Sequence, residues 1–475
     1  WGEITVAEMA SACGGTLVGG DALGLVSGIS TDSRTLRPGN LFVALSGPQF
    51  DGHCFLSQVF SAGAAGAIVS ADRVPAGEME GAVIAVADTL AALGSIARWW
   101  RSLQPATGIA VTGSAGKTST KEMAALVMAS LGPTLKTEGN FNNLIGVPLT
   151  LLRISPEHAY AVVEMGMNRP GEITSLTGMA DPDLGLITNV GMAHLEGLGT
   201  LRGVARAKWE LADGLRPEAS LVINGDDDEL MFCARESERD VITFGTGPDN
   251  RFRAVEIEDR GIEGVRFHIA HDGSSCPVEL QSPGVHHVMN ALGAAALGVT
   301  AGASLQAAAS ALGGFSRLKG RFMVSRLPGG IMLIDDTYNA NPSSLKAALK
   351  SVSGLVGKNR RLLVGLGSMA ELGPSAAGAH LEAGKMVKAS GADRFWAKGV
   401  HASEMIDGAV QAGMSPGRAE ICDSHEQMAS GIKNALRPGD VIFLKGSRSA
   451  AMERVVNILI EAAGGESALL RKAPA

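Results

Sequence analysis

The sequence has few aromatic residues, and its cysteines do not form a pattern that would hold a small domain or a zinc ion. Aromatic side chains make up 4% of the 475 residues, which argues against stacking surfaces for nucleic-acid bases. The five cysteines are scattered and no Cys-x-x-Cys pair occurs, so we expect neither a disulfide framework nor a zinc knuckle. A net charge of -7 also argues against a broad nucleic-acid-binding surface.

Long apolar runs are missing as well. No window reaches the roughly 18 consecutive apolar residues that a membrane span needs. The first residues, Trp1-Gly2-Glu3, lack the basic and apolar regions of a signal peptide, and they lack an initiating Met. We therefore expect a trimmed terminus and a cytoplasmic protein without a membrane span.

The residues that are abundant indicate several globular domains. Hydrophobic residues account for 45% and charged residues for 19% of the chain, which is the balance of a folded protein. A prior of about 150 residues per domain predicts roughly three domains. The 62 glycines predict many tight turns. Pro105 and the segment 319–321 are the candidate boundaries, which gives domains at 1–104, 105–320 and 321–475.

Strands alternate with helical stretches, which predicts an α/β fold. Helices are expected over 89–103, 117–130 and 288–301. The segment 241–280 has short alternating stretches and predicts an antiparallel addition to a parallel sheet. The other expected strands are 41–45, 67–70, 83–86, 108–112, 159–163, 184–188, 220–223, 331–334, 361–364, 394–397 and 441–444.

A glycine-rich loop joins strand 108–112 to the helix that begins at Lys117. Backbone N–H groups of such a loop and the helix N-terminus bind phosphate, Lys117 would reach the terminal phosphates, and the Thr118 hydroxyl would ligate Mg²⁺. The strict pattern with an earlier glycine is not met, because Val111 occupies that position. The loop predicts a nucleoside triphosphate site made by Gly113, Ser114, Ala115, Gly116, Lys117, Thr118 and Ser119.

This loop does not specify a reaction. A motor, a switch GTPase, a kinase and a ligase could all carry it, although the absence of an Asn-Lys-x-Asp string argues against the GTPase. Glu164 ends a buried strand, where ligands of α/β sheets bind, and it is a candidate metal ligand. His194 follows the next strand and could hold a metal or carry a proton. On the residues alone, the alternatives are a solvated strand-end Glu164, a packed or exposed His194, and, for Lys208, a surface lysine.

Several strings occur together in a characteristic order. They are Thr-Gly-Ser-Ala-Gly-Lys-Thr (112–118), Val-Glu-Met-Gly (163–166), Asn-Val-Gly-Met-Ala-His-Leu-Glu (189–196) and Ala-Arg-Ala-Lys-Trp-Glu (205–210). In these strings the chain resembles the Mur ligases, the ATP-dependent amide ligases of peptidoglycan precursor synthesis. Strings at 139–150, 335–344 and 367–373 favour the branch that joins D-alanyl-D-alanine to UDP-N-acetylmuramoyl-tripeptide.

The resemblance implies a three-domain α/β architecture. It comprises a small UDP-binding domain, a central parallel-sheet P-loop ATPase domain, and a C-terminal Rossmann-like domain that closes over ATP and binds the dipeptide. The implied cofactors are ATP and two Mg²⁺ ions, and Lys208 matches a lysine that is carbamylated in the family. The implied metal ligands are Thr118, Glu164, His194 and Lys208.

The resemblance also implies roles for individual residues. Lys117, Lys208, His194 and Arg321 match catalytic positions. Asn290 matches an adenine contact, Asp336 a ribose contact, and Arg321 a phosphate contact delivered across the domain gap. The residues that match the substrate-binding regions are Asn140 and Asn143 for the peptide, and Ser33, Arg34 and His53 for the UDP sugar.

The chain departs from the family pattern at two positions. His287 stands where many relatives have Asn, and Ser368 stands where they usually have Asp. Neither Ser368 nor Glu371 receives a role, and the third residue of the tripeptide stays open between lysine and diaminopimelate. We expect a monomer. The alternatives are a sister Mur ligase or folylpolyglutamate-type ligase, and an ATPase module without ligase activity.

Overall fold

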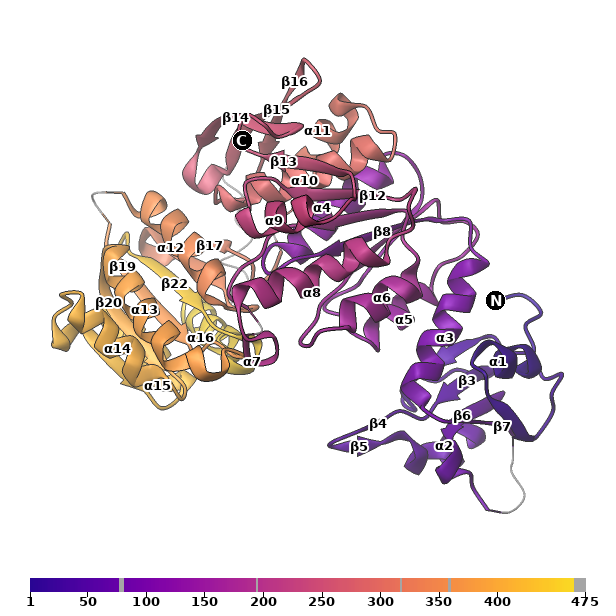
Figure 1. Cartoon of the computed structure of the whole chain (residues 1–475). Coiled ribbons are helices and arrows are strands. Elements are labelled where there is room, and N and C mark those ends of the chain that lie inside the picture. The colour runs from indigo at the N-terminus through magenta and orange to yellow at the C-terminus, as the bar shows by residue number, and fades with distance from the viewer. Residues whose placement is uncertain (77–80, 194, 317, 358–359, 465–475) are drawn as a thin grey trace.

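The computed structural model describes residues 1–76, 81–193, 195–316, 318–357 and 360–464, and each of its three large sheets is built from one consecutive part of the chain (Figure 1). The central sheet lies between the other two. Among the described residues, no helix combines the length and the apolar character needed to cross a bilayer. The sheets confirm the predicted α/β architecture of three units.

The first sheet has five strands in the order β1-β7-β6-β3-β2. Only β1 runs antiparallel to its neighbour. Its strands are β1 (Thr16–Gly19), β2 (Gly28–Ser30), β3 (Asn40–Val43), β6 (Gly66–Ser70) and β7 (Ala82–Val86), beside the small hairpin of β4 (Ser46–Gly47) and β5 (Phe50–Asp51). The helices of this part are α1 (Val6–Ala12), α2 (Leu56–Ser61) and α3 (Thr89–Ser102).

The central sheet has nine strands in the order β16-β15-β14-β13-β12-β11-β8-β10-β9. They are β8 (Thr107–Thr112), β9 (Thr134–Lys136), β10 (Tyr160–Glu164), β11 (Leu184–Ile187), β12 (Ser220–Asn224), β13 (Val241–Gly245), β14 (Phe252–Asp259), β15 (Val265–His271) and β16 (Ser274–Leu280). The helices are α4 (Lys117–Ala129), α5 (Gly146–Leu151), α6 (Glu172–Ala180), α7 (Leu195–Leu198), α8 (Leu201–Gly214), α9 (Asp228–Glu236), α10 (His286–Thr300) and α11 (Leu305–Gly313).

The prediction of an antiparallel addition over 241–280 was partly wrong. β14, β15 and β16 do pair antiparallel, but β13 pairs parallel with β12 and with β14. For the pair of β12 and β13 the reason is the connection. The helix α9 carries the chain from the end of β12 back to the edge of the sheet where β12 begins, and such a crossover produces a parallel neighbour.

Helices cover both faces of the parallel part, which explains its continuous apolar strands. Successive residues of a strand point to opposite faces. Accordingly, Ile109 and Val111 of β8 belong to the core that α4 and α10 share, whereas Ala110 belongs to the core on the side of α6 and α8.

The third sheet has six strands in the order β17-β18-β22-β19-β20-β21, all parallel except β17. The predicted doubly wound arrangement is present, and the two edge strands β17 and β21 are additions that the sequence did not predict. The strands are β17 (Met323–Leu327), β18 (Ile331–Asp336), β19 (Leu362–Gly367), β20 (Ala392–Lys398), β21 (Ala419–Cys422) and β22 (Val441–Lys445). The helices are α12 (Pro342–Val356), α13 (Ala376–Ala389), α14 (Ala402–Gln411), α15 (His425–Ala435) and α16 (Glu453–Ala462).

Candidate active site

The phosphate loop is formed where β8 ends and α4 begins. Gly113 and Gly116 have φ angles of 147° and 80°, a region that favours glycine. A Cβ atom at Gly113 would lie 1.9 Å from Oγ1 of Thr188, and one at Gly116 would lie 2.2 Å from Oδ1 of Asn290. Both glycines are therefore required by backbone conformation and by close neighbours.

The end of β11 holds this loop in place. The Ala115 N–H donates to Oδ1 of Asn189 (2.9 Å), and Nδ2 of Asn189 donates to the Ala115 carbonyl (3.0 Å). Oγ1 of Thr188 donates to the same carbonyl (2.6 Å). Because β8 and β11 pair in parallel register, the loop is fixed before any phosphate arrives.

Lys117 begins α4 and points back over the loop. Its Nζ donates to the Gly113 carbonyl (2.7 Å). Burial lowers the pKa of this amine, and the neighbouring charges of Glu164, Arg321 and Glu371 also act on it. The amine thus lies among charged groups that a nucleotide phosphate would join.

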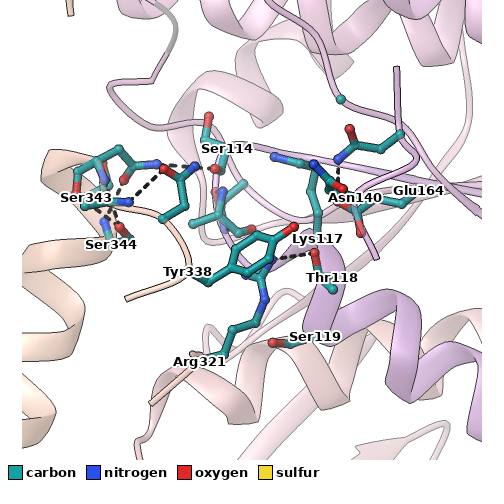
Figure 2. Close-up of a pocket in the computed structure, with 18 of the residues that line it drawn as sticks. Ser114, Lys117, Thr118, Ser119, Asn140, Glu164, Arg321, Tyr338, Ser343 and Ser344 are labelled. Carbon is teal, nitrogen blue, oxygen red and sulfur yellow. Dashed lines mark hydrogen bonds between the residues drawn. The ribbon is translucent and has the colours of Figure 1, made fainter. Parts of the chain in front are cut away.

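Glu164 ends β10, directly beside the phosphate loop (Figure 2). Its side chain is buried, and its Oε1 accepts a hydrogen bond from Nδ2 of Asn142 (2.8 Å). Its Oε2 is buried and has no hydrogen-bond partner in the described part of the chain. A buried carboxylate oxygen without a donor suits a hard cation such as Mg²⁺.

Lys208 lies on α8 and is 1% exposed. Burial lowers the pKa of its amine well below the ordinary range, and the nearby charge of Lys117 lowers it further. Lys208 does not line the cavity itself. The interpretation of Lys208 as a surface lysine, made from its own sequence context, was wrong. The predicted ligand His194 lies outside the described residues.

A cavity of about 810 Å³ separates the phosphate loop from the third sheet (Figure 2). Arg321 reaches across it, and its Nη2 donates to Oγ1 of Thr118 (2.7 Å) while its guanidinium lies 4.1 Å from the ring centre of Tyr338. The lining residues that sequence analysis predicted are Ser114, Ala115, Gly116, Lys117, Thr118, Ser119, Asn140, Asn143, Glu164, Asn290, Arg321 and Asp336.

Two further contacts join the central part of the chain to the part that forms the third sheet. Nδ2 of Asn341, the residue that caps α12, donates to the Ser114 carbonyl (3.4 Å). The Glu196 N–H donates to the Glu371 carbonyl (3.3 Å). The part of the chain that forms the third sheet therefore contacts the central part through polar groups at the phosphate loop and at α7.

Asn143 lines the cavity but also has a structural task. Its Oδ1 accepts hydrogen bonds from the N–H groups of Ile145 and Gly146 (3.1 and 2.9 Å), which fixes the entry to α5. Asn140 lines the same side of the cavity. The loop that is predicted to bind the peptide substrate therefore lies beside Glu164.

The three predicted UDP-sugar residues lie apart from the cavity, in the first sheet's part of the chain. Arg34 is exposed and pairs with Asp32 (2.6 Å). His53 is held from both sides, because its Nε2 accepts from the Ser70 N–H (3.0 Å) and its Nδ1 lies 2.7 Å from Oδ1 of Asp51. Neither these two residues nor Ser33 lines the cavity.

The comparisons with known proteins agree with this geometry. The chain matches the Mur ligase middle domain over residues 111–298, the Mur ligase glutamate ligase domain over 320–448, and the Mur ligase family catalytic domain over 25–101. The UDP-N-acetylmuramoyl-tripeptide–D-alanyl-D-alanine ligase of Escherichia coli (strain K12) is 38% identical over 463 residues, which cover 97% of this chain and 99% of that protein. The chain belongs to the Mur ligase family.

Solved structures of relatives show the same fold. The crystal structure of MurF from Acinetobacter baumannii matches with a TM-score of 0.86 at 32% identity, covering 96% of this chain and 98% of that one. MurF ligase from Thermotoga maritima, solved in complex with ADP, matches with a TM-score of 0.81 at 26% identity, covering 94% and 98%.

The two departures from the Mur ligase pattern have different surroundings. His287 lines the cavity, and burial lowers the pKa of its imidazole well below the ordinary range. Ser368 does not line the cavity; its Oγ accepts from the His401 N–H (3.3 Å) and its carbonyl accepts from Oγ of Ser447 (2.6 Å). Ser368 therefore holds together the segments that follow β19, β20 and β22 of the third sheet.

Sequence analysis missed several residues that shape this Mur ligase site. Tyr338 and Asn142 stand inside strings that were recognised without a role for these residues, and Asn189 stands in another. Lys445 directly follows a predicted strand, which was the available signal, since strand ends of α/β sheets point to ligands.

Proposed function

We propose that this chain joins D-alanyl-D-alanine to UDP-N-acetylmuramoyl-tripeptide with the cleavage of ATP to ADP and phosphate. The observation that carries the proposal is the likeness to the Escherichia coli ligase over nearly the whole of both chains. The cavity supports it, because a phosphate loop, a buried carboxylate and residues of the third sheet line one space.

Each substrate has a proposed place. ATP binds on residues 113–119, with Asn290 at the adenine and Asp336 at the ribose. The tripeptide passes Asn140 and Asn143, and the UDP sugar is held by Ser33, Arg34 and His53 within a domain of residues 1–104. The dipeptide binds residues of the third domain, 321–475, which closes on the central domain, 105–320. We propose that the enzyme works as a monomer in the cytoplasm.

The reaction proceeds in two steps. The terminal carboxylate of the tripeptide attacks the γ-phosphorus, the bond to ADP breaks, and an acyl phosphate forms. The amine of D-alanyl-D-alanine then attacks the acyl carbon, and inorganic phosphate leaves as the amine gives up a proton. Two anions meet in the first step, so Lys117 and Arg321 act by offsetting negative charge at the γ-phosphate.

Mg²⁺ fits the residues present. Oε2 of Glu164 is a buried oxygen without a donor, and the Thr118 hydroxyl lies at the phosphate loop. Thr118 would hold one ion, and Glu164, His194 and carbamylated Lys208 the other. Such ions neutralise phosphate charge.

Lys208 is suited to carbamylation. An amine reacts with CO₂ in its neutral form, and burial lowers the pKa of this amine. The product is an anion on the same side chain, which a nearby cation would stabilise.

Product analysis tests the proposal. The chain is incubated with ATP, Mg²⁺, D-alanyl-D-alanine and UDP-N-acetylmuramoyl-tripeptide that ends in lysine or in diaminopimelate. With at least one of the two tripeptide substrates, we expect a product whose mass is the sum of the masses of the two joined substrates less that of one water. Addition of single amino acids in place of the dipeptide would instead assign a sister ligase. ADP formation without any coupled product would assign an ATPase.

A further inference from the structure

Asp336 and Lys445 form a largely buried ion pair in the wall of the cavity. They end two neighbouring parallel strands, β18 and β22, and stand directly opposite each other in register. Nζ of Lys445 lies 2.5 Å from Oδ2 of Asp336, and the two side chains are 4% and 15% exposed. Both residues line the cavity.

Lys445 also fixes the segment that follows Asp336. Its Nζ donates to the Asn339 carbonyl (3.0 Å), two residues before Asn341, whose side chain reaches the phosphate loop. One ammonium group therefore holds a carboxylate and the turn that leads to the domain contact.

The charge of Asp336 depends on this lysine. Burial raises the pKa of the Asp336 carboxyl, and Lys445, its hydrogen bond and the charge of Arg321 oppose that effect. The Phe322 N–H donates to Oδ1 (3.1 Å). The adjacent Asp335 is a further charged group on β18. His286 on α10 is near Lys445, and burial together with that lysine lowers its pKa to about 4, so it stays neutral at physiological pH.

We propose that Lys445 is a positioning residue for nucleotide binding, which keeps Asp336 ionised and its following turn in place. This inference rests on the proposed function in one respect, the placement of the nucleotide ribose at Asp336. An ionised carboxylate accepts hydrogen bonds from two ribose hydroxyls, and such charge-assisted bonds are about twice as strong as neutral ones. A protonated carboxyl would lose part of that strength.

Calorimetric titration with a non-hydrolysable ATP analogue and Mg²⁺ between pH 5.5 and 8.5 tests the inference. We expect Lys445→Met to weaken binding about tenfold or more, the cost of one charge-assisted hydrogen bond, and to weaken it further as the pH falls, because the carboxyl becomes protonated. The ratio of the variant's Kd to that of the unaltered chain removes the titration of the nucleotide phosphates.

Three variants separate positioning from a general loss of structure. In Asp336→Asn/Lys445→Met the pH-dependent part of the ratio should vanish, and Lys445→Arg should restore a ratio that does not vary with pH. Arg361→Met is the matched structural control. Arg361 pairs with the buried Asp440, which directly precedes the first residue of β22, whereas Lys445 is the last residue of that strand. Arg361→Met should lower the melting temperature and leave nucleotide affinity unchanged. Circular dichroism checks the folding of each variant.

The contrary results are distinct. If the Lys445→Met ratio is one at every pH, or is raised by the same factor at every pH with and without Asp336→Asn, the inference is overturned. Should Lys445→Met not fold, a pH-dependent ratio for Lys445→Arg would overturn it as well. An unaltered, folded chain that binds no nucleotide would overturn the proposed function and the inference together. The results named before it would overturn the inference alone, so the two failures can be distinguished.

Discussion

The two walls of the cavity are built from different kinds of structure. The first wall is the edge of one parallel sheet, where the ends of β8, β10 and β11 lie in register and place the phosphate loop beside Glu164. The second wall comes from another sheet. Polar contacts such as that of Arg321 with Thr118 (2.7 Å) join it to the first wall, and apolar or ring contacts of Ile262 and Phe322 also lie between the two parts of the chain.

This difference in structure indicates that the two walls serve different parts of the reaction. Contacts within one buried core are rigid, whereas an interface between domains that have separate cores permits relative motion. We therefore expect the first wall to bind phosphate and metal, and the second wall to add the contact with the ribose and to determine how fast the bound groups react. The following changes test that division, beginning with the largest effect.

Replacement of Lys117 should abolish most of the activity. Lys117→Met removes the cation that we propose to face the phosphates, and we expect turnover to fall about 10²–10³-fold, as when one preorganised electrostatic donor is lost. Phosphate release measures it. The control is Lys136→Met, which removes a half-exposed lysine paired with Glu122 and should keep full activity. A loss below tenfold for Lys117→Met would contradict the assignment of this wall.

Removal of the Glu164 charge should act through the metal. Glu164→Gln keeps the shape and should raise the Mg²⁺ concentration for half-maximal activity, with turnover down on the order of a hundredfold at low Mg²⁺, the upper range for disturbed metal sites. Activity is measured over a Mg²⁺ titration. Glu157→Gln, at an exposed position, is the control. An unchanged Mg²⁺ requirement would show that Glu164 does not face the ion.

The second wall is tested by Arg321→Ala. We expect turnover to fall roughly 10–100-fold, the cost of a charge-assisted hydrogen bond to phosphate, with an unchanged melting temperature. Nucleotide affinity should change less than turnover. Arg326→Ala, on the exposed side of β17, is the control. Unchanged turnover would count against closure of the third domain over ATP.

The smallest effect is expected far from both walls. Arg34→Ala should raise the KM for the UDP substrate about fivefold, the effect of one exposed ionic contact of roughly 1 kcal/mol, and leave the KM for ATP unchanged. Arg37→Ala is the control at a nearby exposed position. An equal rise of both KM values would mean that Arg34 supports the fold and not the sugar site.

The same division explains how much could be predicted from the sequence. The strand–loop–helix unit of the first wall is local, since Gly113, Gly116 and Lys117 lie within five residues and the two glycines have backbone angles that favour glycine. The neighbourhood of Glu164 followed from a general rule about strand ends. These parts of the fold needed only short segments of sequence.

The second wall could be predicted only in part. Arg321 and Asp336 came from the family resemblance, and their actual partners, Thr118 and Lys445, are far away in the sequence. Such pairs depend on strand order and domain placement, which periodicity does not contain. The parallel pairing of β13 was missed for a related reason, because short alternating strands look alike in either direction.

The most direct test of the account is phosphate release with ATP, Mg²⁺ and UDP-N-acetylmuramoyl-tripeptide, in the presence and absence of D-alanyl-D-alanine. If both walls serve one ligase reaction, sustained release requires the dipeptide. Release at the same rate without it would contradict the account, since the cavity would then hydrolyse ATP without forming the amide bond.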